Sequence, residues 1–167
     1  MTDKDKAYEI RWARRDDWKP AMMMIWKTFM KFEAKDYSSE GIHNFFKFIT
    51  DDDLYRAFLD GNYQLLLATD NNRIVGAASV RNRNHLSLLF VDEEYHHRGI
   101  GRTLMNNLCS YLEFEEGERF MSLKAAPYAV GFYEKLGFKI VKPEEVYSGI
   151  RVTPMEKFFD RSIDGVC

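Results

Sequence analysis

The stretch LLFVDEEYHHRGIGRTLM, residues 88–105, joins three patterns that decide the fold. Its first residues end the apolar run 85–91, which is typical of a strand covered on both faces. Glycines follow at positions 99 and 101, and apolar residues then recur at helical spacing from Ile100 onward. The stretch therefore predicts a strand, a glycine turn and a helix that packs on the strand.

The glycine turn is a candidate anion site. The first N–H groups of a helix have no acceptor within the helix, and the helix dipole adds roughly half a positive charge there. Gly99 and Gly101 lack the Cβ atoms that would hold a pyrophosphate off the backbone, and Arg98 and Arg102 can add charge. No Walker motif is present, and Leu104 stands where a dinucleotide fingerprint needs its third glycine. The turn alone leaves two interpretations open, a phosphate cradle and a plain strand–helix turn.

The overall composition indicates one globular domain over residues 1–167. The chain is 46% hydrophobic and 30% charged, enough for a real core. A net charge of −2 argues against a nucleic-acid partner, and the longest apolar runs are too short to span a membrane. The N-terminus has no apolar signal-peptide core, and Cys109 and Cys167 are interpreted as reduced thiols, so a cytoplasmic protein is expected.

The rest of the chain predicts further strands and helices. Strands are expected at 8–13, 63–69, 73–80, 85–91, 119–125, 138–141 and 150–157. Helices are expected at about 16–32, 38–49, 50–60, 100–112 and 127–136. Thr50 with Asp53 is taken as the cap that starts the third helix, and Gly61 as its end. The fold class is α/β (α+β), with a mixed sheet of about seven strands flanked by helices.

A second segment, APYAVGFYEKLGFK at residues 126–139, accompanies the glycine turn. Together the two segments resemble the GCN5-related N-acetyltransferase (GNAT) family, which uses acetyl-coenzyme A. The family's loop reads Gln/Arg-x-x-Gly-x-Gly/Ala, and here residues 96–101 align with it. The resemblance implies a mostly antiparallel, twisted sheet with splayed central strands. It also implies a cofactor-binding core over residues 85–139 and acceptor-side helices over residues 33–60.

The resemblance also assigns residues to the cofactor. Backbone amides of the loop are expected to hold the coenzyme A pyrophosphate, and the strand backbone before the loop is expected to pair with the pantetheine arm. Two positions depart from the family, since His96 replaces the usual Gln or Arg and Lys124 stands where many members carry an asparagine. The predicted cofactor contacts are Leu89, Phe90, Val91, His96, His97, Arg98, Gly99, Ile100, Gly101, Arg102, Thr103, Lys124, Tyr128, Phe132 and Tyr133.

Acyl transfer to an amine needs a base for the amine and an acid for the leaving thiolate. By resemblance, Tyr133 is the candidate acid and a backbone N–H near Phe90 or Val91 polarises the carbonyl; the alternative for Tyr133 is aromatic packing. Glu33 is the candidate base, because apolar neighbours raise a carboxyl pKa. A solvated glutamate, a proton relay through His85 and a water chain remain alternatives. The two loop histidines are not interpreted as catalysts or metal ligands.

The acceptor side is rich in acidic residues. Residues 33–60 hold seven acids (33, 36, 40, 51, 52, 53 and 60) and three bases (35, 47 and 56), a net charge of −4 that can attract a cationic amine or simply form a solvated face. The sequence thus predicts an acetyl-CoA-dependent N-acetyltransferase, of EC 2.3.1 type, acting on a primary amine of a small molecule or peptide. It predicts no metal, nucleic-acid or membrane partner, and it leaves a homodimer open. The alternative is an acyl-CoA-binding sensor with little turnover.

Overall fold

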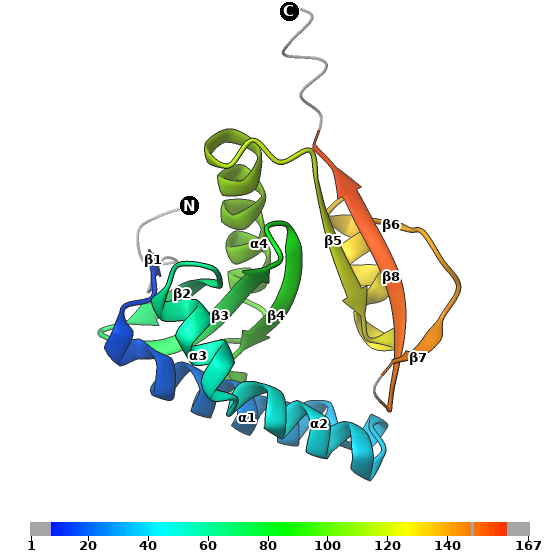
Figure 1. The fold of residues 1–167 in the computed structure, drawn as a ribbon, viewed down its shortest axis with the longest axis horizontal. Helices are drawn as coiled ribbons and strands as arrows, with labels where there is room; N and C mark the ends of the chain where they lie inside the picture. The colour runs from blue at the N-terminus through cyan, green and yellow to red at the C-terminus, as the bar shows by residue number, and fades with distance from the viewer. Residues whose placement is uncertain (1–7, 148, 160–167) are drawn as a thin grey trace, which may run out of the picture.

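The computed structural model describes residues 8–147 and 149–159. Its strands are β1 (Glu9–Trp12), β2 (Gln64–Asp70), β3 (Arg73–Arg81), β4 (His85–Val91), β5 (Phe120–Ala125), β6 (Lys139–Ile140), β7 (Glu145–Tyr147) and β8 (Ile150–Phe158). Its α-helices are α1 (Trp18–Phe32), α2 (Ser39–Ile49), α3 (Asp52–Leu59), α4 (Ile100–Ser110) and α5 (Val130–Lys135). The strands form one sheet in the order β1-β2-β3-β4-β5-β8-β6, with β7 on β8 (Figure 1). The mixed, mostly antiparallel sheet is confirmed, with β4 and β5 as its parallel pair.

The two central strands part soon after they meet. The pairing between β4 and β5 consists of the single register position His85–Ser122, and the strands then diverge along their length (Figure 1). On its other side β4 pairs with β3 throughout, from Arg81–His85 to Gly76–Val91. The predicted splay of the central strands is therefore confirmed, and it leaves the β5-facing edge of β4 open.

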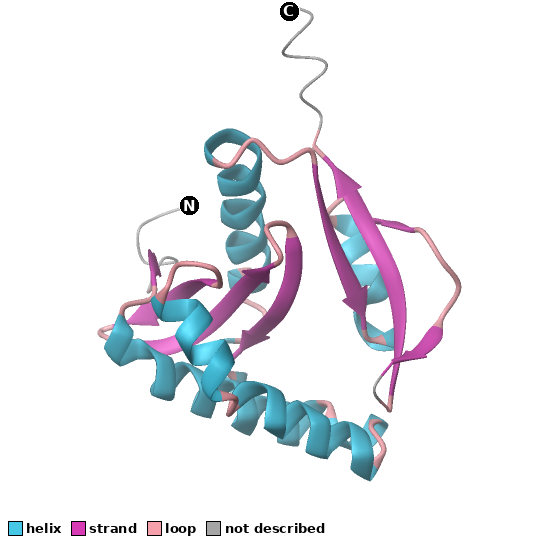
Figure 2. Cartoon of the chain, viewed as in Figure 1, coloured by secondary structure: helices cyan, strands magenta, loops and turns pink. Residues whose placement is uncertain are grey.

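Helices cover both faces of the β1–β4 half of the sheet (Figure 2). One apolar cluster joins α4, through Ile100 and Leu104, to the strands, and the other joins α1, through Ile25 and Phe29. The apolar run of β4 is less covered than its sequence predicts, because Leu89 is only half-buried beside the splay. The sheet therefore has one apolar core on each face, each covered by helices, and the sheet opens where β4 diverges from β5.

Three local predictions need correction. Asp51 caps α3, with its carboxylate accepting from the Asp53 N–H, whereas the Thr50 hydroxyl donates to the Phe46 carbonyl of the preceding helix. The helix expected from about residue 16 begins at Trp18, after a 3₁₀ turn at 15–17, and the Asp17 carboxylate pairs with Arg11 and accepts from the Arg14 N–H. Strand β7 was not predicted, since its three residues are exposed and carry no periodic pattern. The predictions for the first seven residues and for Cys167 lie outside the described residues.

Candidate active site

Two cavities meet where β4 and β5 part. The larger, about 790 Å³, is lined by Thr28, Phe32, Glu33, Leu89, Phe90, Val91, Tyr95, His96, His97, Gly99, Ile100, Gly101, Arg102, Tyr128, Ala129, Phe132 and Tyr133. The smaller, about 190 Å³, is lined by Glu33, Tyr37, Phe45, Arg81, His85, Leu86, Ser87, Leu88, Leu89, Phe90, Leu123, Lys124, Ala126, Tyr128, Ala129, Tyr133, Tyr147, Ile150 and Val152. Both lists contain Glu33, Tyr128 and Tyr133, so these side chains stand at the junction of the two cavities.

The glycine turn borders the larger cavity at the start of α4. Gly99 is the N-cap of the helix and has a φ of 77°, a left-handed conformation that favours glycine. Gly101 lies within the first helical turn, where a Cβ would meet the Phe132 ring at 3.5 Å and the Val91 side chain at 3.9 Å, both ordinary contacts. By contrast, a Cβ at Gly76 of β3 would lie 2.9 Å from Ile100, so packing itself requires that glycine. Packing does not require glycine at 101, and the missing side chain leaves the helix N-terminus open to a ligand.

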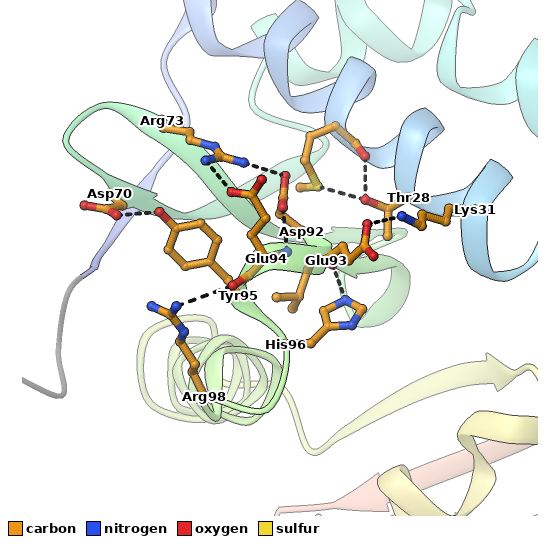
Figure 3. A network of polar contacts seen from close by, with 12 residues as sticks. Thr28, Lys31, Asp70, Arg73, Asp92, Glu93, Glu94, Tyr95, His96 and Arg98 are labelled. Carbon is orange, nitrogen blue, oxygen red and sulfur yellow. Dashed lines mark hydrogen bonds and ion pairs between the residues drawn. The ribbon is translucent and has the colours of Figure 1, made fainter.

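The loop before the glycines is fastened to β2 and β3 through Tyr95 (Figure 3). The Tyr95 ring lies between two guanidinium groups, with Arg73 at 5.4 Å and Arg98 at 4.8 Å from its centroid. Its hydroxyl donates to the Asp70 carboxylate, and Arg73 also pairs with Asp92 at 3.3 Å. These contacts join the loop to strand residues 19–25 positions earlier in the chain.

His96 has a structural contact of its own (Figure 3). Its Nε2 lies 2.7 Å from the Val91 carbonyl oxygen at the end of β4, and its ring centroid lies 5.1 Å from that of Phe32 in α1. The neighbouring His97 has a φ of 64°. Among the described residues, no group of three His, Cys, Asp or Glu side chains can hold a metal ion. The His96 ring therefore ties the loop to the strand end.

Glu33 follows the last residue of α1 and is buried, with only 8% of its surface exposed. Burial raises its pKa to about 7, and hydrogen bonds from Tyr128 and Tyr37 offset part of that rise. The Tyr37 hydroxyl lies 3.5 Å from Oε1 of Glu33. The alternative of a solvated loop glutamate is therefore wrong, and the carboxyl group can change protonation near neutral pH.

Tyr133 is buried in α5 and lines both cavities. Its ring packs edge-on against Phe132 and Phe138, with centroids 5.2 and 5.8 Å away. Burial and the nearby charge of Glu33 both raise the pKa of Tyr133, so the phenol keeps its proton at neutral pH. The placement suits both aromatic packing and proton donation into the junction.

His85 begins β4 and lines the smaller cavity. It is half-buried, and its Nδ1 lies 2.9 Å from the Ser122 hydroxyl of β5. Burial and the charges of Arg81 and Lys124 lower its pKa to about 4, so the imidazole is neutral at physiological pH.

The comparison with known families decides what this arrangement belongs to. A family model described as "Acetyltransferase (GNAT) domain" matches residues 33–159. The chain belongs to the GNAT acetyltransferase family. A Bacillus subtilis (strain 168) protein named as an acetyltransferase is 32% identical over 108 residues, which are 63% of this chain and 73% of that protein.

Solved structures share the GNAT fold along most of their length. A GCN5-related N-acetyltransferase from Rhodopseudomonas palustris has a TM-score of 0.77 at 24% identity, covering 90% of this chain and 95% of that one. A PaiA N-acetyltransferase from Thermoplasma acidophilum, solved in complex with coenzyme A, has 0.75 at 21%, covering 91% and 99%. A spermidine N-acetyltransferase variant from Vibrio cholerae has 0.66 at 15%, covering 97% and 99%. Within the described residues of this GNAT protein, no helix is long and apolar enough to cross a membrane.

Most predicted cofactor contacts of this GNAT protein line the larger cavity, and three do not. The Arg98 guanidinium lies on the Tyr95 ring, and the Thr103 hydroxyl donates back to the Gly99 carbonyl at 2.9 Å. Lys124 lines the smaller cavity, away from the glycine turn. Those that do line the larger cavity are Leu89, Phe90, Val91, His96, His97, Gly99, Ile100, Gly101, Arg102, Tyr128, Phe132 and Tyr133.

Several side chains of the smaller cavity were missed by sequence reasoning. Tyr37 follows α1, Arg81 ends the buried strand β3, and Tyr147 ends the unpredicted β7. The available signal was an arginine that closes the otherwise apolar run of β3. Of the seven acids in residues 33–60, only Glu33 lines this cavity, so the acidic segment is largely a solvated face.

Proposed function

We propose that this GNAT protein transfers the acetyl group of acetyl-CoA directly to a primary amine of a small molecule or peptide. The observation that carries the proposal is the junction of the two cavities at Glu33 and Tyr133. The larger cavity extends from this junction to the glycine turn, and the smaller one extends to Arg81, His85 and Lys124. The donor and the acceptor can therefore reach the junction from separate sides.

The residues of the larger cavity fit coenzyme A. Its pyrophosphate would lie at the N-terminus of α4, where free backbone N–H groups and the helix dipole favour an anion. The open position at Gly101 supports this, because packing does not require a glycine there. The unpaired edge of β4 near Leu89 offers backbone groups to an amide-containing arm. When bound, acetyl-CoA supplies an activated acetyl group as a thioester.

The two junction side chains suit the two proton transfers. Overall, the amine loses one proton and the departing sulfur gains one. Glu33 would accept the proton of the amine, since a base with a pKa of about 7 works well near neutral pH. Tyr133 would donate to the sulfur, since burial keeps its phenol protonated. These roles are proposed from placement and chemistry together.

An amine panel tests the proposal. Purified protein is mixed with acetyl-CoA and with small amines or short peptides, and release of the coenzyme A thiol is followed. In parallel, acetyl-CoA should raise the melting temperature, because a ligand that binds only the folded state stabilises it. A thermal shift without thiol release for any amine would favour an acyl-CoA-binding sensor. No thermal shift at saturating acetyl-CoA would contradict the proposal.

A further inference from the structure

The smaller cavity has a cationic wall built from three neighbouring strands. Arg81 ends β3, His85 begins β4 and is its register partner, and Lys124 lies in β5. All three line the cavity, and Arg81 and Lys124 are absent from the residues that line the larger cavity. His85 is neutral, so two positive charges remain on this wall.

Arg81 lacks a protein counter-charge. Its Nε is buried without a hydrogen-bond partner, and no ion pair to Arg81 occurs, among the residues that the structure describes. The contact that the guanidinium does make is with the Phe48 ring, whose centroid lies 5.8 Å away. A buried donor left unsatisfied costs about 1–3 kcal/mol, and the guanidinium stays charged at any physiological pH. Because Arg81 lines the smaller cavity, an anionic ligand group there would supply the missing counter-charge.

Lys124 is only partly compensated. Its Nζ lies 3.4 Å from the centroid of the Tyr147 ring, and 4.0 Å from Oε1 of Glu145, the outer limit of an ion pair. The acid that lines the cavity is Glu33, which stands at the junction with the larger cavity and accepts hydrogen bonds from tyrosines. The wall that holds Arg81 and Lys124 thus carries excess positive charge.

We infer that the acceptor is a compact amine that also carries a carboxylate, with its amine at Glu33 and its carboxylate bound by Arg81 and Lys124. This inference rests on the proposed function. A guanidinium binds a planar carboxylate through two parallel hydrogen bonds, and the Arg81 side chain lines the cavity where such a group would lie. The cavity of about 190 Å³ is smaller than the roughly 300–1,000 Å³ typical of drug-sized ligands, so the acceptor is small. A polycation such as spermidine would meet repulsion at this wall.

Matched pairs of L-amino acids and their C-terminal amides test the inference, with thiol release giving kcat/KM. The two members of a pair differ only in the carboxylate. The amine of the amide is less basic, so more of it is unprotonated at neutral pH, and the amide should react faster unless the protein recognises the carboxylate. We expect kcat/KM for the preferred acid to exceed that for its amide by tenfold or more. Aminoalkylphosphonates test whether a tetrahedral anion substitutes for the planar one, and spermidine serves as the cationic probe.

Variants locate the recognition. Arg81→Gln and Lys124→Gln should each lower the acid-to-amide ratio by about tenfold, the worth of roughly one charge-assisted hydrogen bond. Arg83→Gln is the matched control, because Arg83 follows closely on the same turn, is 83% exposed and pairs with Glu118. It should leave the ratio unchanged. An acetyl-CoA thermal shift in each variant confirms folding, and if Arg81→Gln does not fold, Lys124→Gln carries the test.

The outcomes separate this inference from the proposed function. If amides or spermidine are acetylated at least as well as the acids, the acceptor inference is wrong and the proposed function stands. If the acids are preferred and the ratio survives both Arg81→Gln and Lys124→Gln, the assigned wall is wrong. If acetyl-CoA binds but no amine releases thiol, the proposed function itself fails.

Discussion

The two cavities of this GNAT protein are built in different ways. The larger takes most of its lining from one continuous segment, from Leu89 at the end of β4 to Arg102 in α4, and this segment includes the glycine turn, where the backbone at Gly101 is open. The smaller takes its lining from the segment after α1 and from α2, α5, β3, β4, β5, β7 and β8, so it is assembled from side chains far apart in the sequence. A backbone site depends on local conformation, whereas a side-chain site depends on how distant strands are placed.

The largest expected effect is at the junction, where the two kinds of site meet. Tyr133→Phe removes the phenol and keeps the ring that packs on Phe132 and Phe138. If the phenol donates the proton, kcat should fall by about 10²–10⁴-fold, the usual worth of general acid catalysis. Acetyl-CoA affinity, measured by thermal shift, should change less than about threefold, because the backbone site is untouched.

The control for this variant is Tyr147→Phe, which removes a hydroxyl at the far wall of the smaller cavity and keeps the ring under Lys124. Unchanged kcat in Tyr133→Phe would mean that Tyr133 only packs, and the proton for the sulfur would have to come from water.

Glu33→Gln should give the next largest effect on turnover. With a pKa of about 7, the wild-type carboxyl group gains its basic form as pH rises from about 6 to 8, so kcat/KM should rise over this range. The variant should lose this limb and at least about tenfold in activity, because general base catalysis contributes roughly 10²–10⁴-fold where it operates. If kcat/KM of Glu33→Gln still rises between pH 6 and pH 8, the rise belongs to the titration of another group, such as the amine substrate itself.

The same carboxyl group should also change stability with pH. Its folded pKa lies above the ordinary value of 4.5, so the folded state holds the proton more tightly than the unfolded state. The protein should therefore lose stability as pH rises from about 4.5 to about 7, by an amount on the order of 3 kcal/mol. Denaturant unfolding at pH 5 and pH 8 should show a smaller loss in Glu33→Gln than in the wild type. An equal loss in both would show that Glu33 ionises freely in the folded protein.

Gly101 isolates the backbone site. Gly101→Ala places a Cβ 3.5 Å from the Phe132 ring, so the free protein accepts it and gains up to about 1 kcal/mol of helix propensity. If coenzyme A lies against this backbone, acetyl-CoA affinity should nevertheless fall, by about tenfold for Ala and more for Val. A higher melting temperature without ligand, together with a smaller acetyl-CoA shift, is the expected pair of results. Unchanged affinity would show that the glycine turn only connects strand to helix.

The difference between a site formed by one local segment and a site assembled from distant strands also explains which parts of the site the sequence could predict. The β4–loop–α4 unit was predictable because Leu89, Gly99 and Leu104 lie within one short segment, where periodicity and glycine spacing are direct signals. Glu33 was predictable from its aromatic neighbours, although its hydrogen bonds come from Tyr37 and from Tyr128, far along the chain.

Arg81 was not predictable, because an arginine at a strand end is usually solvated, whereas here its Nε is buried and its guanidinium lies near the Phe48 ring of α2. The same holds for Tyr147, whose strand is short and exposed and exists through its pairing with β8. The predicted cap of α3 was wrong by one residue, because Thr50 and Asp51 are adjacent and both are residue types that commonly cap helices. Local patterns therefore located the larger cavity, and the smaller cavity required the assembled sheet.

The smallest effect should come from the long-range fastening of the loop. Tyr95→Phe removes the hydrogen bond to Asp70 and keeps the ring between Arg73 and Arg98. One such bond is worth about 1 kcal/mol, so the melting temperature should fall by about 2–4 °C. Tyr111→Phe, which removes a similar bond to Glu116 away from both cavities, is the matched control. Acetyl-CoA affinity should change less than about twofold in either variant, because the left-handed Gly99 and the helix start are local. A tenfold loss in Tyr95→Phe alone would mean that a side chain from β2 sets the loop conformation, and the larger cavity would then depend on distant strands as the smaller one does.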